Sequence, residues 1–297
     1  MTAPTRKGVH ARLEQLPPGS PPDFRPGRTL RLRVEFVRQL KRRRTQFALL
    51  LVLVLPIVVA LAFKLGGSPT RESSGPTLID LATTGGSNFT LFVEFAANTF
   101  LLVVLVALFC GDTVASEASW ASLRYLLAMP VPRARLLRQK LIVALSLSFA
   151  ANLLLPVWSF AVGTVLFGGA PAKSPTSGSF TLAASLDRLL IVVLYICGQL
   201  LVVAALAFLL SVTVDNPLGA VGGATMLVVL SNIIDQITAL GRYRKYLPTH
   251  FQFSWLDALG PKVVWDDMLR GTGVALIYAA VFLAVAWLRF DRKDVTS

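Results

Sequence analysis

The sequence predicts an all-α, polytopic membrane protein with six transmembrane helices behind an N-terminal amphipathic helix. Of its 297 residues, 54% are hydrophobic and only 15% are charged, whereas a soluble domain carries about 25% charged residues. The mean hydropathy is +0.64. The apolar residues also gather into six long runs, and a run of about 20 residues crosses a bilayer as a helix.

The six predicted spans form a transmembrane domain over residues 47–290. Each is expected to be helical because a segment in hydrocarbon must pair its own backbone N–H and C=O groups. The first run is too long, and begins too far into the chain, for a cleaved signal peptide. The spans are residues 47–65, about 89–111, about 140–167, about 186–214, about 217–240 and about 271–290.

The segment ahead of the first span has two parts. Residues 1–26 are rich in proline and lack apolar periodicity, which predicts a disordered arm. Residues 27–46 are predicted to form an amphipathic elbow helix in the membrane interface. It either touches a cytosolic partner or serves only as a lipid anchor and topology signal. Its apolar residues recur at helical spacing between basic ones: Leu30, Val34, Val37 and Leu40.

Lysine and arginine are distributed unevenly along the chain. Twelve of the 29 precede residue 47, and 20 fall on one side when the N-terminus is placed inside. The positive-inside rule then puts both termini, including a tail over residues 291–297, in the cytoplasm. Arginine outnumbers lysine 21 to 8, which suggests a bacterial genome and therefore a bacterial inner membrane. The formal charge of +13 therefore indicates membrane lipids as a partner, through anionic headgroups, and no nucleic acid.

Residues suited to catalysis or metal binding are few and scattered. Cys110 and Cys197 are too few for a disulfide framework or a Cys-rich metal site. His10 and His250 are isolated, and they are predicted to lie on opposite sides of the membrane. An integral-membrane enzyme needs clustered His, Asp or Glu. The sequence therefore predicts no catalytic site, no bound metal and no cofactor on this chain.

The turn between the fourth and fifth spans is tight. Asp215 or Asn216 can cap the next helix, and Pro217 suits its first position. Gly219 and Gly223 then form a G-x-x-x-G pattern, which lets two helices approach closely. This pattern indicates either a subunit interface or packing within one bundle.

Residues 241–270 are too many for a simple turn and too polar for a span. The aromatic residues Phe251, Phe253, Trp255 and Trp265 lie along them, and amphipathic aromatic side chains prefer the headgroup layer. We expect one or two short helices that dip into the outer leaflet. An ordinary exterior loop is the alternative.

Polar residues inside spans are costly and suggest a function by default. Those in the outer halves of the second and fifth spans are candidates for a substrate pathway between two facing subunits. Hydrogen bonding within the bundle, or a place at the outer water boundary, is the alternative. For the more central Asn152 and Gln199, bonding within the bundle is the favoured interpretation. The pathway candidates are Glu94, Asn98, Asn232 and Asp235.

The loop between the second and third spans carries the most information. Asp112 can cap a helix over residues 112–130, and Pro130 with Pro132 would stop it. A basic stretch then leads into the third span. A capped, charged helix under a membrane bundle is suited to docking another protein. A connector that hugs the membrane is the alternative.

This loop resembles the cytoplasmic signature of the ABC-2 type permeases, the membrane subunits of ATP-driven exporters. In that family an acidic residue is followed by a Leu-rich helix end, a proline, a basic residue and a lysine that starts the next span. Where the family often has Gly-Thr, this chain has Ala121-Ser122. The family's elbow helix, six spans and short helices before the sixth extend the resemblance from about residue 28 onward. The matching positions are Glu117, Leu126, Leu127, Pro130, Arg133 and Lys140.

The resemblance implies a transport subunit that exports a lipid, a peptide or a drug-like molecule. Two such permeases, identical or paralogous, pair with two cytosolic ATPase subunits, which hold ATP and Mg. This chain has no nucleotide-binding motif, so hydrolysis is expected on a separate polypeptide. A stand-alone secondary transporter or channel is the rival, although the internal repeat typical of such proteins is not evident. The residues expected to couple to the ATPase are Glu117, Trp120, Arg124, Tyr125 and Met129.

Overall fold

The computed structural model describes residues 32–66, 77–119, 133–174 and 178–292. These residues are almost entirely helical, which confirms the predicted fold class. A short antiparallel hairpin joins β1 (Lys173–Ser174) to β2 (Gly178–Ser179). The helices are α2 (Leu32–Leu40), α3 (Arg43–Gly66), α4 (Leu78–Leu81), η2 (Ala82–Thr84), α5 (Gly86–Thr99), α6 (Leu101–Ser119), α8 (Arg133–Phe167), α9 (Leu182–Thr213), α10 (Pro217–Asp235), η3 (Thr238–Tyr246), η4 (Ser254–Leu259) and α11 (Asp266–Asp291).

Six helices in the described part of the chain are long and apolar enough to cross a membrane: α3, α6, α8, α9, α10 and α11. Few residues in the apolar stretches of α3, α10 and α11 are buried within the molecule, whereas most of those in α6 are buried. Large exposed apolar surfaces mark contact with a membrane or another protein. The chain is therefore a multi-pass membrane protein with α6 in its interior.

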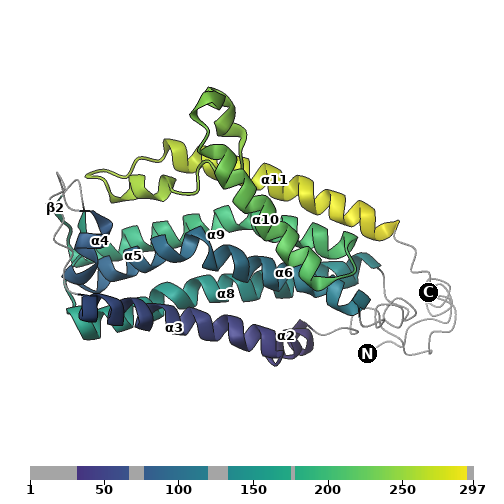
Figure 1. The fold of residues 1–297 in the computed structure, drawn as a ribbon, viewed down its shortest axis with the longest axis horizontal. Coiled ribbons are helices and arrows are strands. Elements are labelled where there is room, and N and C mark those ends of the chain that lie inside the picture. The colour runs from purple at the N-terminus through teal and green to yellow at the C-terminus, as the bar shows by residue number, and fades with distance from the viewer. Residues whose placement is uncertain (1–31, 67–76, 120–132, 175–177, 293–297) are drawn as a thin grey trace, which may run out of the picture.

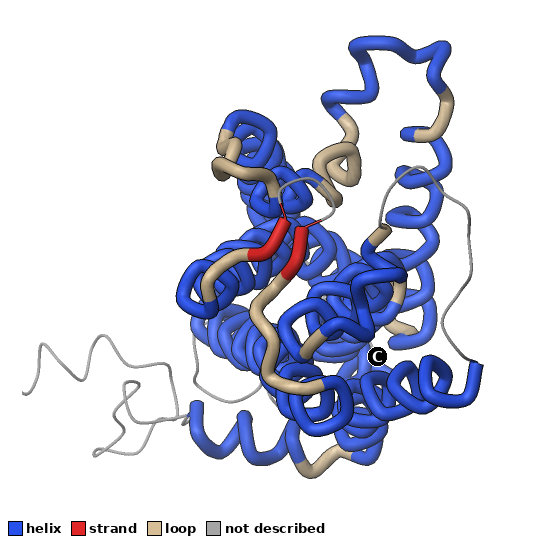
Figure 2. The backbone as a smooth tube through the Cα atoms, turned by 90° about the vertical axis from the view of Figure 1, so that its left-hand side faces the viewer, coloured by secondary structure: helices blue, strands red, loops and turns tan. Residues whose placement is uncertain are grey.

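The long helices run side by side along the longest axis of the molecule (Figure 1). Helix α9 packs against α6, α10 and α11, and α8 packs against α3, α5 and α6. Helix α2 and the C-terminal end of α11 lie at one end, which we call the basal end. The β1–β2 hairpin lies across the opposite end, the hairpin end (Figure 2). Helix α10 is inclined to the others (Figure 1).

The second predicted span is two helices, because the chain breaks between α5 and α6. Phe100 leaves the helical region, with φ −142° and ψ −52°. The hydroxyl of Thr99 donates to the carbonyl of Phe95 at 3.3 Å. Backbone that is not helical at membrane depth is tolerated only where protein buries it or where it lines a cavity. Hydropathy alone cannot show this break, because apolar residues continue across it.

Several helix boundaries differ from the predicted ones: α10 ends at Asp235 and α11 begins at Asp266, five residues from the predicted limits. The elbow helix α2 ends at Leu40, and Arg43 already begins α3. Helix α6 continues through Asp112 to Ser119, so Asp112 caps no new helix. Helix α8 begins at Arg133, well before the predicted span. Helices α6 and α8 extend beyond their apolar runs, because polar and charged residues at the basal end are helical too. The predicted arm over residues 1–26 and residues 120–132 lie outside the described residues.

The turn before α10 is confirmed, with Asn216 as the cap. Its side chain accepts a hydrogen bond from the backbone N–H of Leu218 at 2.9 Å, and Pro217 takes the first helical position. The short helices expected over residues 241–270 are also present, as η3 and η4. Their insertion into the outer leaflet stays a prediction.

Candidate functional site

Four charged side chains meet at the basal end and form what we call the basal charge network. Nζ of Lys140 lies 2.6 Å from the carboxylate of Glu117, and these side chains are only 3% and 4% exposed. Arg38 binds both Glu117 and Glu35. Lys140 also lies 3.7 Å from Glu35. The network therefore joins α2 to the last turn of α6 and to the first turns of α8.

A second cluster lies one turn deeper on α6. The two carboxylate oxygens of Asp112 bind Arg42 and Arg44, each at 2.7 Å. Arg42 also donates to the hydroxyl of Ser116 at 3.2 Å. Asp112 thus fixes the junction between α2 and α3 against α6, which replaces the predicted role of Asp112 as a helix cap.

The basal charge network flanks residues 120–132, which connect α6 to α8. Glu117 was expected to contact an ATPase directly, but the structure buries it and pairs it with Lys140 and Arg38. Its side chain therefore fixes the last turn of α6, and its contact with an ATPase stays a prediction. The other predicted coupling residues lie outside the described residues: Trp120, Arg124, Tyr125 and Met129.

The pKa of Glu35 makes the docking of α2 sensitive to acid. Burial raises the pKa of this carboxyl, but Lys140 and the hydrogen bonds from Arg38 and Gln39 outweigh it, so the pKa lies below its ordinary value of 4.5. A lowered folded-state pKa contributes stability above the unfolded pKa, and that stability is lost as the pH falls through the folded pKa.

We therefore expect Glu35→Gln to lower thermal stability at neutral pH and to lose this effect in acid. The difference in melting temperature between wild type and Glu35→Gln should shrink as the pH falls below about 4.5. Scanning fluorimetry of the detergent-solubilised protein across the pH range measures it. A difference that stays constant down to acid pH would contradict the role of the Glu35 carboxylate.

Several polar side chains are buried in the half of the bundle nearer the hairpin end. Glu94 of α5 is fully buried, and neither carboxylate oxygen has a hydrogen-bond donor among the described residues. The amide of Asn152 on α8 donates to Sγ of Cys197 on α9. An uncompensated carboxyl inside a membrane bundle is costly, so Glu94 remains a candidate for function.

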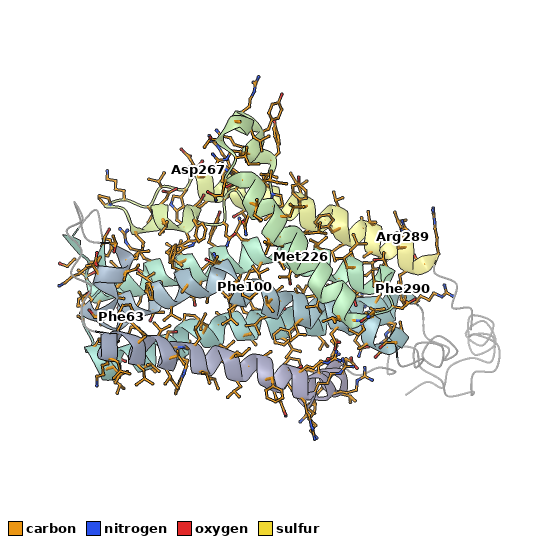
Figure 3. All side chains as sticks on the ribbon, viewed as in Figure 1. Phe63, Phe100, Met226, Asp267, Arg289 and Phe290 are labelled. Atoms are coloured by element: carbon orange, nitrogen blue, oxygen red, sulfur yellow. The ribbon has the colours of Figure 1, made fainter. Side chains whose placement is uncertain are left out.

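Asn98 closes the break between α5 and α6. The side chain of Gln252 donates to the backbone carbonyl of Asn98 at 3.1 Å, and the Asn98 amide donates to the carbonyl of Gln252 at 3.4 Å. Nearby, the hydroxyl of Tyr195 donates to the carbonyl of Phe251 at 2.6 Å. These bonds tie the segment between η3 and η4 to the interior of the bundle. Figure 3 shows Phe100, at the break, near the middle of the long axis.

A cavity of about 340 Å³ lies beside this break. It is bounded by the break itself, by α9, by the outer half of α10, by the segment after η3, and by Phe282 of α11. Asn98 lines it, whereas Glu94, Asn232 and Asp235 do not. Of the predicted pathway residues, Asn98 therefore reaches the cavity, and Glu94 is enclosed by the bundle.

Asp235, at the end of α10, has partners that the sequence did not indicate. Its carboxylate lies 2.6 Å from Nδ1 of His250 and 3.3 Å from Nε of Arg244. Ser231 and Thr249 hydrogen-bond to each other at 2.8 Å close by. His250, expected to be isolated, thus helps to hold the segment after η3 against α10. Asn232 is half-buried.

Gly219 and Gly223 lie close to α9 of the same chain. A Cβ atom at Gly223 would lie 3.3 Å from Cδ1 of Leu210, and one at Gly219 would lie 3.2 Å from Cγ1 of Val214. This geometry supports packing within one bundle. Contact with a second subunit at these glycines stays a prediction.

Arg188 holds the hairpin end together. Its guanidinium donates to the carbonyls of Ala258 and Gly260, and to that of Pro261 at 3.2 Å. It also lies 3.9 Å from the ring centroid of Phe180. Sequence analysis missed this residue, because nothing near it in the chain indicates the distant carbonyls it binds.

The fold and these clusters define a multi-pass helical membrane protein with ion pairs at one end and a buried polar region toward the other. The chain belongs to the family described as a protein of unknown function, DUF2705, which matches residues 78–296. No curated protein matches the chain.

Proposed function

We propose that this chain is the permease subunit of an ATP-driven exporter, with ATP hydrolysis on a separate cytosolic chain. The observation that carries the proposal is the basal charge network. It joins α2, α6 and α8 on both sides of residues 120–132, the segment whose sequence resembles the ABC-2 signature. Glu117 and Lys140 are two of the matching positions, and they bind each other.

The network supports a mechanical role for the connecting segment. Ion pairs buried from water hold their partners in a fixed geometry, so α6, α8 and α2 move together at the basal end. A push on residues 120–132 would then displace two membrane-spanning helices rather than bend a loop. Such a displacement can shift a bundle between two conformations when the pushing subunit binds one of them better.

The proposal also orients the chain. The basal end faces the cytoplasm of a bacterial inner membrane, where the ATPase subunits bind, and the hairpin end faces outward. The exported molecule is a lipid, a peptide or a drug-like compound, and a second copy or a paralogue completes the membrane unit. The clustering of basic residues before residue 47 supports this orientation.

Co-purification tests the proposal directly. The tagged full-length chain, extracted in mild detergent, is expected to retain an ATP-hydrolysing partner. Arg124→Glu should release that partner and stop ATP-dependent export without reducing membrane insertion. Arg289→Glu is the matched control, because Arg289 is an exposed basic residue at the basal end of α11 (Figure 3). Absence of a co-purifying ATPase, or full export by Arg124→Glu, would overturn the proposal.

The broken second span favours one rival function. Discontinuous helices line the substrate sites of many secondary transporters, and this chain has a break at Phe100. A secondary transporter would move its substrate in vesicles that contain this chain alone and an ion gradient. Such uptake without any ATPase would favour the rival, and strict dependence on ATP would exclude it.

A further inference from the structure

The cavity beside the α5–α6 break combines apolar walls with a small set of neutral polar groups. Its walls are mainly valine, leucine and isoleucine side chains of α9 and α10. Its polar lining comes from Asn98, Gln199, Ser231, Thr249 and Gln252. Its volume, about 340 Å³, lies at the small end of the range of ligand pockets, roughly 300–1,000 Å³.

Gln199 is the polar group here that the protein leaves incompletely paired. Its side chain is more than nine-tenths buried in the middle of α9, and its amide nitrogen has no acceptor among the described residues. A buried donor left without an acceptor destabilises the folded protein. Rotation of the side-chain amide group by a flip exchanges its nitrogen and oxygen, so Gln199 can present either a donor or an acceptor to a ligand.

The lining also excludes a charged ligand group. Every side chain that lines the cavity is uncharged, and burying a charge without a partner is far more costly than burying a neutral polar group. Asp235 and His250, each next in the chain to a residue that lines the cavity, bind one another, and Asp235 also binds Arg244. A suitable ligand therefore has an aliphatic body and an uncharged head that forms hydrogen bonds.

We propose that this cavity binds a neutral acylated amphiphile, with the acyl chain between α9 and α10 and the ester or hydroxyl head at the Gln199 amide. The cavity lies beside the helix break, where Asn98, in the last turn of α5, adds a neutral polar group to its lining. This site does not depend on the proposed export function, because binding needs only this chain.

Photo-crosslinking tests the site with a defined probe. The full-length chain in nanodiscs is incubated with a monoacylglycerol that carries a diazirine in its acyl chain, and crosslinked peptides are identified by mass spectrometry. We expect labelling of α9 and α10 around Val203 and Leu227. Unlabelled monoacylglycerol should compete about tenfold better than the fatty-acid anion or the alkane of equal length, because each of these lacks the uncharged hydrogen-bonding head.

Three variants assign the binding to the cavity. Gln199→Leu keeps the volume but removes the amide, and it should weaken competition by monoacylglycerol about fivefold while leaving that by the alkane unchanged. Val203→Phe fills the cavity and should reduce labelling more than tenfold. Leu194→Phe is the matched control, because Leu194 lies on the same helix, is half exposed and does not line the cavity.

Melting temperatures of the variants distinguish a loss of binding from a loss of folding. Gln199→Leu should melt no lower than wild type, because it removes a buried donor that lacks an acceptor. Uniform labelling of lipid-facing surfaces, equal competition by all three compounds, or wild-type binding by both cavity variants would overturn the proposal. Because no ATPase is present, loss of binding would leave the proposed export function untouched.

Discussion

Lys140→Met should lower the free energy of unfolding by about 3–5 kcal/mol, the usual cost of removing one partner from a buried ion pair. The variant leaves the Glu117 carboxylate buried, with Arg38 still bound to it. Arg38 is half exposed, so water screens its charge and it compensates poorly for the loss of Lys140. The uncompensated charge at the base of α6 is the source of the destabilisation.

Titration of the detergent-solubilised protein with SDS measures this effect. Arg38→Met should cost much less, about 1 kcal/mol or below, because one partner of that pair is exposed. The double variant Lys140→Met with Glu117→Gln should recover most of the loss, since neither member of the buried pair is then charged. Equal losses for Lys140→Met and Arg38→Met would show that the Glu117–Lys140 pair is not the principal contact of the network.

Arg188→Met should destabilise the hairpin end by about 2–3 kcal/mol, because hydrogen bonds to charged groups and the contact with an aromatic face are lost together. The carbonyls of Ala258 and Gly260 would lose the Arg188 guanidinium as their donor. The loss should be local. The basal charge network lies at the other end of the bundle and should be unaffected.

Hydrogen exchange resolves this prediction by region. Arg188→Met should speed exchange over η4 and the residues after it, and leave α6 and α8 near Lys140 unchanged. Arg188→Lys is the conservative control, because it keeps the charge but not the planar set of donors that reaches several carbonyls. It should restore only part of the protection. Unchanged exchange over η4 in Arg188→Met would contradict an anchoring role.

Membrane class and number of spans were predictable because they depend on local composition. A bilayer imposes a length of about 20 apolar residues on each helix, and this signal is present in every span. The cap at Asn216 was also predictable, since a cap involves only neighbouring residues. The boundaries were less predictable: hydropathy ends where the apolar run ends, whereas α8 begins at Arg133 and α6 continues to Ser119.

The candidate site was only partly predictable. Glu117, Glu94 and Asn98 could be selected from the sequence because polar residues stand out in or beside apolar runs. Their roles could not be assigned in this way. Glu117 is buried against Lys140, and Asn98 binds Gln252, because residues far apart in the chain meet only after the helices pack.

The sequence by itself determined that this chain crosses a membrane six times, and which apolar run forms each crossing. It could do so because the cost of placing polar backbone and side chains in hydrocarbon is felt locally, residue by residue. Only the tertiary structure decided that the second crossing is broken at Phe100, that α2 is held to α6 and α8 by ion pairs, and that a cavity opens beside the break. Each of these features depends on pairs of distant residues, and their energies are gained only when the bundle assembles.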